Sequence, residues 1–303
     1  MEYRNLPDLS GLATLKAVVE LGGVAEAGQA LCVGQPAVTK RLRALDNCYG
    51  VSLMQRKGRR LELTPAGEKV YAYARLTLDH QTSLLDDLAS LRTGQNRLRL
   101  EVTSAIGEHM LPDLLLNFAD TYPEYQIDSR MGYTRRIQKR LATGLSDMAL
   151  LELAPDHPDI LVQKWLDDEV VLVCGPTHPL RGIDLIPVTK LNQLSYILRE
   201  RSSSMRITLE KALNDIGIDQ VPIAMEVGSM DTIVEMLQRG KHVSFLPRFV
   251  VEEALIKGSL YHIRIQGLCI SRTLWIARTR SNLNNAVCEA FIQILRGMKP
   301  LTA

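Results

Sequence analysis

The chain has 303 residues, of which 46% are hydrophobic and 23% are charged, enough apolar side chains for about two globular domains. No apolar run approaches the roughly 18–20 residues that cross a bilayer, and the opening MEYRNLPDLS lacks the basic and apolar regions of a secretory signal. The five cysteines are scattered and form no CxxC pair. These features predict a cytoplasmic protein with reduced thiols, no membrane partner and no cysteine metal cage.

Positive charge is concentrated near the N-terminus, although the whole chain carries only +2. Residues 1–64 hold nine Lys/Arg and six Asp/Glu, while the remainder is close to neutral. Within residues 35–60, seven basic residues stand against one acidic residue. Such a segment suits either a solvated surface or contact with nucleic acid.

The first 64 residues predict a winged helix-turn-helix. Apolar residues at helical spacing predict a helix over 9–21 that Gly22-Gly23 ends, followed by a short helix over 24–31. A turn over 32–34 leads into a third helix, in which Pro36 is tolerated because it lies in the first turn. Two short helices around a turn that contains glycine are typical of the helix-turn-helix. Residues 52–64 then predict a β-hairpin with a basic tip at 57–60.

A long helix is predicted over 65–92. Thr64 suits the N-cap and Pro65 the first helical position. A mostly apolar stripe recurs at spacings of four and three, which is typical of coiled coils, and its polar Thr77 and Gln81 would weaken the seam while helping to fix its register. The helix could pack on its own domain, but its place between two domains favours a partner helix. The stripe consists of Val70, Ala74, Thr77, Gln81, Leu84, Leu88 and Leu91.

Beyond residue 92, predicted strands alternate with helices, which indicates α/β layers with mostly parallel sheets in two lobes around a cleft. Strands are predicted over 97–104, 125–132, 147–153, 169–175, 195–200, 224–229 and 242–247, and near the end in LYHIRI and RTLWIAR. Helices are predicted over 110–123, 136–144, 205–216, 230–239 and 284–297.

The helix that begins at Gln35 has two distinct faces. Val38, Leu42 and Leu45 fall on one side and would pack on the preceding helices. The opposite side and the hairpin offer groups that suit DNA: Gln and Arg can pair with base edges, and Lys and Arg with phosphates. The alternative is a three-helix bundle with a solvated basic face, but two basic elements beside one helix favour DNA. The predicted DNA-binding residues are Gln35, Pro36, Thr39, Lys40, Arg43, Arg56, Lys57, Arg59 and Arg60.

On these motifs the chain resembles the LysR-type bacterial transcriptional regulators over essentially its whole length. The N-terminal resemblance lies in ALCVGQPAVTKRLRALDNCYGVSLMQRKGRRLELTPAG, and the C-terminal one in MLPDLLLNFADTYPEYQI, LATGLSDMALL, VLVCGPTHPL and EVGSMDTIVEMLQRGKHVSFLP. The resemblance to this family implies three parts: an all-α winged helix-turn-helix domain (1–64), a linker helix for dimerisation (65–92) and an α/β effector domain like a type 2 periplasmic binding protein (93–303). Lobe I would comprise 93–167 and 270–303, and lobe II 168–269, with crossovers near 165–169 and 269–272.

The resemblance also implies partners: double-stranded promoter DNA, a small-molecule effector, a second copy in a homodimer through the linker helix, a homotetramer, and RNA polymerase. The sequence departs from the family pattern at several glycines. Gly34 replaces the usual serine before Gln-Pro, so a side-chain cap is missing, and Gly28 is expected to loosen its helix. Gly22-Gly23-Val24 and Gly240-Lys241-His242 depart from the usual Gly-Ser-Phe and Gly-Leu-Gly.

Small hydroxyls precede several helices of the second region, where backbone N–H groups attract anions. Arg199 and Arg206 flank one serine run and could donate charge-assisted bonds to a small organic anion. The alternative for each Ser or Thr is a simple N-cap. The predicted effector-binding residues are Thr103, Ser104, Tyr133, Thr134, Arg199, Ser202, Ser203, Ser204 and Ser229.

An enzyme is the main competing class, but GxSxG, GxGxxG, P-loop and HExxH motifs are missing from the sequence. The six histidines lie far apart in sequence, and Asp167-Asp168-Glu169 is interpreted as a solvated loop. A solute-binding protein would need a signal peptide and would leave the first 92 residues unexplained. The sequence therefore predicts a DNA-binding transcriptional regulator with no catalytic residue, metal or cofactor.

Overall fold

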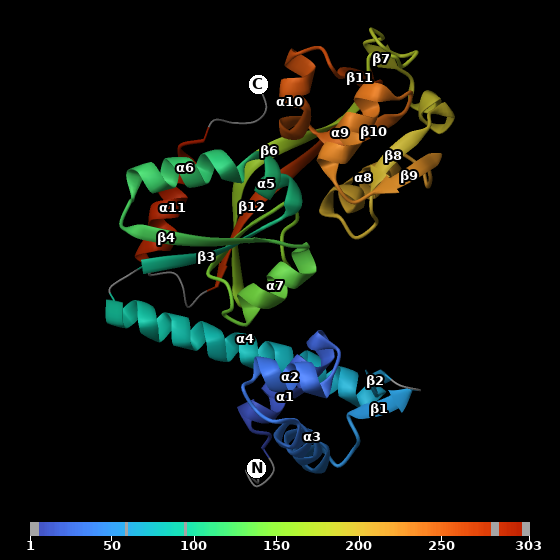
Figure 1. Cartoon of the computed structure of the whole chain (residues 1–303). Helices are drawn as coiled ribbons and strands as arrows, with labels where there is room; N and C mark the ends of the chain where they lie inside the picture. Colours follow the sequence, from blue (N-terminus) through green and yellow to red (C-terminus); the bar gives the residue numbers. More distant parts are fainter. Residues whose placement is uncertain (1–5, 58–59, 94–95, 280–284, 299–303) are drawn as a thin grey trace. The chain divides into compact units, whose positions relative to one another are not determined.

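The structure, a computed structural model, describes residues 6–57, 60–93, 96–279 and 285–298 (Figure 1). The chain divides into two compact units, residues 1–93 and residues 94–303. Each unit has its own hydrophobic core.

The N-terminal unit contains three short helices, a hairpin and a long helix, as predicted. Helix α1 begins after Asp8, whose carboxylate accepts a hydrogen bond from the Gly11 amide at 2.7 Å, and ends at Gly22 with φ 84°. Both ends match the predicted helix, because a capping acid and a left-handed glycine define them locally. The elements are α1 Leu9–Leu21, α2 Val24–Ala30, α3 Gln35–Tyr49, β1 Met54–Lys57, β2 Arg60–Leu63 and α4 Pro65–Thr93.

The residues of the predicted stripe on α4 lie in two different environments. Val70 and Ala74 are buried in the unit's own core with Leu12 and Leu15 of α1. The prediction of a partner helix was therefore wrong for this first part, where packing within the domain prevails. Leu84 and Leu88 are 52% and 53% exposed, and the Leu91 side chain lies outside the described residues.

Helix α4 starts in close contact with the hairpin. The Thr64 hydroxyl accepts a hydrogen bond from the Gly67 amide at 3.0 Å and donates one to the Ser52 carbonyl at 2.8 Å. A Cβ atom on Gly67 would lie 1.9 Å from the Leu53 carbonyl oxygen. Only glycine therefore permits this approach between the helix and the residue that precedes the hairpin.

The C-terminal unit is built on one mixed sheet with strand order β4-β3-β5-β12-β6-β10-β8-β9. Its first part contains β3 Asn96–Val102, α5 Ser104–His109, α6 Leu111–Thr121, β4 Tyr125–Met131, α7 Thr134–Ala142 and β5 Met148–Leu151, and α11 Ala286–Arg296 packs on it. In Figure 1, α6 and α7 lie on opposite sides of these strands.

The second part follows the long strand β6 Ile160–Cys174 and precedes the return strand β12 Ile270–Thr279. It contains β7 Leu185–Ile186, the 3₁₀ helix η2 Val188–Gln193, β8 Tyr196–Arg199, α8 Ser204–Asp215, β9 Ile223–Val227, α9 Met230–Arg239, β10 Val243–Pro247, α10 Arg248–Ile256 and β11 Tyr261–Ile265. We refer to the part around β3, β4 and β5 as lobe I and to the part around β8, β9 and β10 as lobe II.

Strands β6 and β12 belong to both lobes. They pair antiparallel from Ile160 with Thr279 to Val170 with Ile270. Leu166 and Leu274 lie in the core of lobe I, whereas Val170 and Ile270 lie in the core of lobe II.

The sheet and its helices differ from the prediction in several places. Strands within each lobe are parallel, but β5–β12, β12–β6 and β6–β10 are antiparallel, so the sheet is more mixed than predicted. Strand β6 begins at Ile160, well before the predicted strand, because it continues into lobe I. Helices α5 and α10 were not predicted; α5 has only six residues, too few for a clear helical pattern.

A buried ion cluster lies on the shared strands. Arg272 of β12 donates to Asp168 of β6 at 2.8 Å and to Glu152 at 2.6 Å. Asp168 is fully buried, so its interpretation as part of a solvated loop was wrong. Burial raises the pKa of the Asp168 carboxyl, and the charge and hydrogen bond of Arg272 offset this only in part, while the nearby negative charge of Glu152 raises the pKa further.

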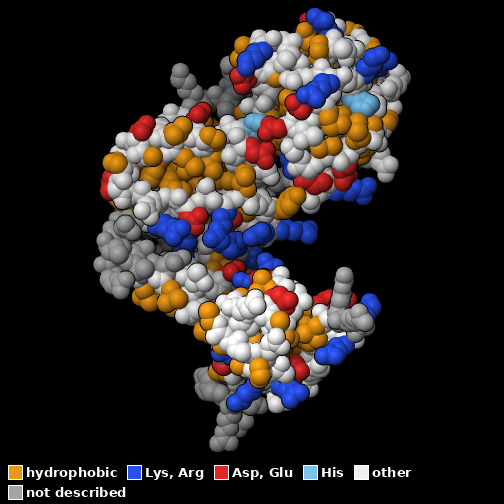
Figure 2. Space-filling model, in the orientation of Figure 1, with side chains coloured by type: hydrophobic (Ala, Val, Ile, Leu, Met, Phe, Trp, Pro, Cys, Tyr) orange, Lys and Arg blue, Asp and Glu red, His pale blue; other side chains and the backbone are white. Residues whose placement is uncertain are grey.

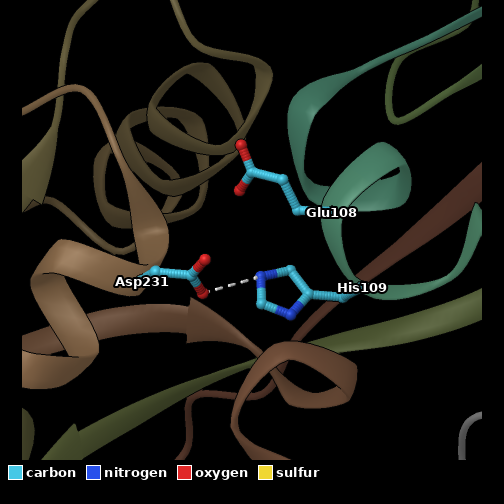
Figure 3. Close-up of side chains that lie close together, drawn as sticks. All are labelled: Glu108, His109 and Asp231. Atoms are coloured by element: carbon cyan, nitrogen blue, oxygen red, sulfur yellow. Dashed lines mark ion pairs between the residues drawn. The ribbon is translucent and has the colours of Figure 1, made fainter. Parts of the chain in front are cut away.

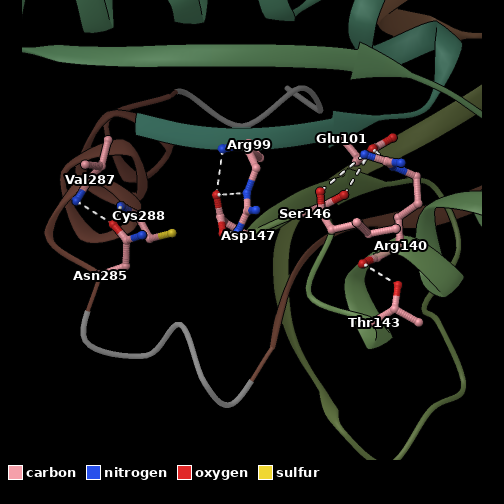
Figure 4. A network of polar contacts seen from close by, with 10 residues as sticks. Arg99, Glu101, Arg140, Thr143, Ser146, Asp147, Asn285, Val287 and Cys288 are labelled. Atoms are coloured by element: carbon pink, nitrogen blue, oxygen red, sulfur yellow. Dashed lines mark hydrogen bonds and ion pairs between the residues drawn. The ribbon is translucent and has the colours of Figure 1, made fainter. Parts of the chain in front are cut away.

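Lobe I is fastened internally by a second polar network (Figure 4). Glu101 of β3 accepts hydrogen bonds from Arg140 of α7 and, at 3.0 Å, from Ser146. The Asp147 carboxylate accepts hydrogen bonds from the Arg99 backbone amide and from one nitrogen of the Arg99 guanidinium, each at 2.7 Å. These bonds hold α7 and the start of β5 against β3.

Replacement of Gly67 by alanine should destabilise the N-terminal unit, because the added Cβ meets backbone that cannot rotate away. We expect a loss of about 1–3 kcal/mol or more in the free energy of unfolding, measured by urea denaturation. Gly34→Ala is the control, since its Cβ would meet only Pro36 Cδ at 3.5 Å. Equal effects of the two substitutions would contradict the proposed contact.

Candidate functional site

The predicted DNA-binding residues of α3 lie on one exposed face of the helix. Val38 and Leu45, on the opposite face, are 0% and 2% exposed. Burial against the other helices therefore fixes which side of α3 faces solvent. That side forms a shallow groove lined by Gln35, Pro36, Thr39, Lys40, Arg43, Ala44 and Asn47.

Asn47 was missed by the sequence analysis. It is exposed on α3 one turn after Arg43, within the same groove. Its spacing of four from Arg43 was the available signal. An asparagine amide can pair with both polar atoms of the adenine edge, so Asn47 extends the set of side chains able to read bases.

The hairpin adds cations beside α3. Arg56 is exposed, and Lys57 is exposed although its amine lies 3.9 Å from the Glu62 carboxylate. Arg59 lies outside the described residues, as does the side chain of Arg60. Figure 2 shows Lys and Arg side chains around the part of the N-terminal unit that carries α3 and the hairpin.

The turn before α3 explains two of the unusual glycines. Gly34 is the N-cap of α3, with φ −69° and no side-chain hydrogen bond, so its backbone would accept the usual serine. The Gly28 carbonyl accepts the Val33 amide at 2.9 Å, and a Cβ on Gly28 would lie 2.9 Å from the Val33 carbonyl. Gly28 thus lets the turn pack closely on α2, which does not support the expected loosening.

The predicted effector residues of the two lobes meet in direct contacts. Tyr133, at the start of α7, donates its hydroxyl hydrogen bond to Glu200 at 3.0 Å. The hydroxyls of Thr134 and Ser204 lie 3.0 Å apart. The structure therefore brings the N-terminal ends of α7 and α8 together between the lobes.

The other predicted hydroxyls lie in three kinds of environment. Ser203 and Ser229 cap α8 and α9, accepting the amides of Arg206 at 3.1 Å and Thr232 at 3.3 Å. Their hydroxyls therefore have the structural role that was the alternative for them. Ser202 is exposed and Ser104 half-buried. Thr103 is 3% exposed, and its hydroxyl oxygen has no hydrogen-bond partner among the described residues.

Arg199 is buried and its charge is already neutralised. It donates two hydrogen bonds to the adjacent Glu200, at 2.8 and 2.9 Å. Burial lowers the pKa of the Arg199 guanidinium, but its bonds to Glu200 more than compensate, so the net shift is upward. The sequence analysis missed Glu200, although it stands next to Arg199 in the chain.

Arg206 is also 4% exposed and donates to Glu210 at 2.7 Å and to the Arg199 carbonyl at 3.0 Å. This side chain braces α8 against the end of β8, so the structure gives it a scaffold role.

Comparisons with known proteins agree with this architecture. The profile of the bacterial regulatory helix-turn-helix proteins of the lysR family matches residues 9–68, and that of the LysR substrate binding domain matches residues 92–299. The HTH-type transcriptional regulator YeiE of Escherichia coli K12, described as uncharacterized, is 30% identical over 284 residues, which cover 92% of this chain and 94% of YeiE.

Two solved structures have the same fold. Full-length CbnR in complex with its target DNA has a TM-score of 0.75 at 21% identity and covers 95% of this chain and 99% of its own. The CcmR regulatory domain of Synechocystis PCC6803, in complex with 2-PG, has a TM-score of 0.61 at 25% identity and covers 67% of this chain and 96% of its own.

The winged helix-turn-helix and the two-lobed α/β unit define a DNA-binding regulator with an effector domain. The chain belongs to the LysR family of transcriptional regulators, since the two profiles together cover most of its length. Among the described residues, no helix is both long and apolar enough to cross a membrane.

The contact between Tyr133, Arg199 and Glu200 should make stability depend on pH. Burial raises the pKa of Glu200, but the hydrogen bond from Arg199 and its charge outweigh this, and the net pKa is lowered. A lowered pKa in the folded state gives stability above the ordinary glutamate pKa that is lost as pH falls through the folded value. We expect Glu200→Gln to lower the free energy of unfolding at pH 7 and the difference to disappear below the ordinary range of glutamate.

Urea denaturation of both proteins between pH 7 and pH 3 measures this difference. Glu235→Gln is the control, because Glu235 and its partner Arg239 are 64% and 76% exposed and such pairs contribute little. A Glu200 difference that stays constant over this range would contradict the assigned role.

Proposed function

We propose that this regulator reads specific DNA sequences with the exposed face of α3 and changes its activity when a small organic anion binds between the lobes. The observation that carries the first part is the groove that Gln35, Thr39, Arg43 and Asn47 share on α3. Amide, hydroxyl and guanidinium groups on one helix face match the donor and acceptor pattern of the major groove.

Phosphate contacts are assigned to the cations beside this face. Lys40 lies in the groove of α3, and Arg56 and Lys57 are exposed on the hairpin. Arg59 and Arg60 remain predicted phosphate contacts, and Pro36 a packing contact at the start of the helix. The DNA complex of CbnR supports a DNA partner through the likeness of the whole chain.

The effector is proposed to bind where lobe I and lobe II meet. The buried Thr103 hydroxyl has no partner among the described residues, so it can bond a ligand without giving up a protein contact. Arg199 can bind an anion that takes over the bonds of Glu200. The CcmR complex with 2-PG supports a small-molecule effector. The other residues proposed for this site are Ser104, Tyr133, Thr134, Ser202, Ser203, Ser204 and Ser229, of which Ser203 and Ser229 also cap their own helices.

A homodimer is proposed through the second part of α4. Leu84, Leu85 and Leu88 are 52%, 57% and 53% exposed, and such apolar residues on one helix favour a partner helix. The proposed divisions are 1–64 for DNA binding, 65–92 for the linker helix and 93–303 for the effector domain. Lobe I comprises 93–167 and 270–303, and lobe II 168–269.

Further assembly and location follow from family membership. We include a homotetramer, contact with RNA polymerase, a cytoplasmic location and no enzymatic activity in the proposal. The relative YeiE is named as a transcriptional regulator, which supports a regulatory rather than a catalytic role.

Arg43→Ala should reduce discrimination between specific and random DNA about 5- to 150-fold, because a paired Arg–base contact is worth about 1–3 kcal/mol. Arg56→Ala should weaken binding to both DNAs equally and reduce the salt slope by about one. The measurement is fluorescence anisotropy at several salt concentrations, with a duplex selected in vitro by this protein. Lys211→Ala, an exposed cation on α8, is the control. Equal loss on both DNAs from Arg43→Ala would count against base readout.

Thr103→Val should abolish effector binding without destabilising the protein. The substitution removes a buried hydroxyl that makes no bond to the described residues and keeps its volume, so the free energy of unfolding should stay equal or rise. Thermal shift with a panel of small carboxylates and phosphates, 2-PG included, identifies a stabilising anion. That shift should vanish in Thr103→Val and persist in Thr121→Val, whose threonine lies at the exposed end of α6. Retention of the shift in Thr103→Val would remove Thr103 from the site.

A further inference from the structure

Three potential metal-binding side chains meet between the lobes, apart from the effector residues. Glu108 and His109 lie at the end of α5 in lobe I, and Asp231 lies in the first turn of α9 in lobe II. One potential ligand atom of each lies within 4.8 Å of the others. Figure 3 shows the His109 ring directed at Asp231, with Glu108 beside them.

The distance between His109 and Asp231 does not fit a hydrogen bond. His109 Nε2 lies 3.4 Å from Asp231 Oδ1, beyond the usual 2.7–3.2 Å range for such bonds. This nitrogen is buried and has no hydrogen-bond partner among the described residues. Two ligand atoms that each lie about 2.0–2.1 Å from one tetrahedral ion are about 3.4 Å apart. The observed pair therefore has the spacing of two neighbouring ligands.

The surroundings hold one ligand fixed and leave the others accessible. The His109 side chain is 19% exposed, and its ring packs edge to face on Phe249, with centroids 6.5 Å apart. The Asp231 side chain is 69% exposed and Glu108 is also exposed, so an ion can enter from solvent and both carboxylates can adjust. Two carboxylates this close repel each other, and a dication would turn the repulsion into attraction.

We propose that Glu108, His109 and Asp231 bind a divalent transition metal of the zinc type. One imidazole nitrogen with two carboxylates suits zinc and its first-row neighbours, whereas magnesium and calcium prefer oxygen ligands alone. Three protein ligands leave at least one position for water. The sequence predicted no metal because its histidines are far apart, but the fold brings His109 against Asp231 over 122 positions of the chain.

Metal binding would link the lobes. The ligands come from α5 on one side and α9 on the other, so the ion favours the arrangement in which these helix ends touch. Phe249, which holds His109, also lies beneath the Arg272 guanidinium at 5.8 Å, next to the ion cluster on the shared strands. Zinc would therefore stabilise the C-terminal unit whether or not the proposed effector site is correct, because neither Thr103 nor Arg199 is a ligand.

The experiment is calorimetric titration of the full chain with ZnCl₂ under reducing conditions, with MgCl₂ in parallel. The variants are His109→Asn, Asp231→Asn and Glu108→Gln, of which the last two change exposed side chains that belong to neither core of the unit. His157→Asn is the matched control: this lobe I histidine lies 3.9 Å from Asp159 but has no third ligand among the described residues. Absorption of the Co²⁺ form distinguishes nitrogen and oxygen ligands from the thiolates of exposed cysteines.

We expect one zinc site per chain, weakened at least about tenfold in His109→Asn and Asp231→Asn and retained in His157→Asn. Glu108→Gln should weaken it as well, magnesium should not compete, and Co²⁺ should lack thiolate charge-transfer bands. Unchanged zinc affinity in Asp231→Asn, thiolate bands, or equal loss in His157→Asn would overturn the proposal. DNA binding and the anion-induced thermal shift test the proposed function separately, so the two can fail independently.

Discussion

The pairing of β6 with β12 is the constraint on which the C-terminal unit depends. The two strands run side by side from the core of lobe I into the core of lobe II, and no other described strand belongs to both cores. Arg272 and Asp168 face each other on this pair, both buried, and Glu152 also accepts a hydrogen bond from Arg272, so removal of Arg272 would leave two buried carboxylates without their cation. A relative movement of the lobes must therefore occur as bending of these strands between the two cores.

The side-chain contacts between the lobes are polar pairs, in contrast to this backbone pairing. Tyr133 with Glu200, Thr134 with Ser204, and His109 with Asp231 each join a side chain of one lobe to a side chain of the other. Polar pairs of this kind can be exchanged for bonds to a ligand at little net cost. The shared strands thus join the lobes through their cores, and the side-chain pairs join them at the helix ends.

In the N-terminal unit, the packing of the helices determines which face of α3 is exposed to solvent. Val38 and Leu45 are buried by the neighbouring helices, and this leaves the polar side of α3 in solvent. Helix α4 completes the same core through Val70 and Ala74 and is joined to the hairpin by the contact at Gly67. Its later leucines are exposed, so one helix both completes the core of the domain and carries an apolar surface in solvent.

The sequence alone predicted the local features: the ends of α1, the cap at Thr64, the two faces of α3 and the alternation of strands and helices. These features depend on residues within one or two turns, where periodicity and capping act directly. The LysR resemblance supplied the rest of the predicted architecture. The short helix α5 was not predicted, because six residues are too few to show a helical period.

Only the tertiary structure decided which polar residues already have partners. Arg199 is held by Glu200, Ser203 and Ser229 cap their own helices, and Thr103 has a buried hydroxyl with no partner among the described residues. It also placed Asp168 in the interior and brought His109 to Asp231. The physical reason is that sequence spacing determines which side of an element a residue occupies, whereas pairing depends on what the fold places opposite that side.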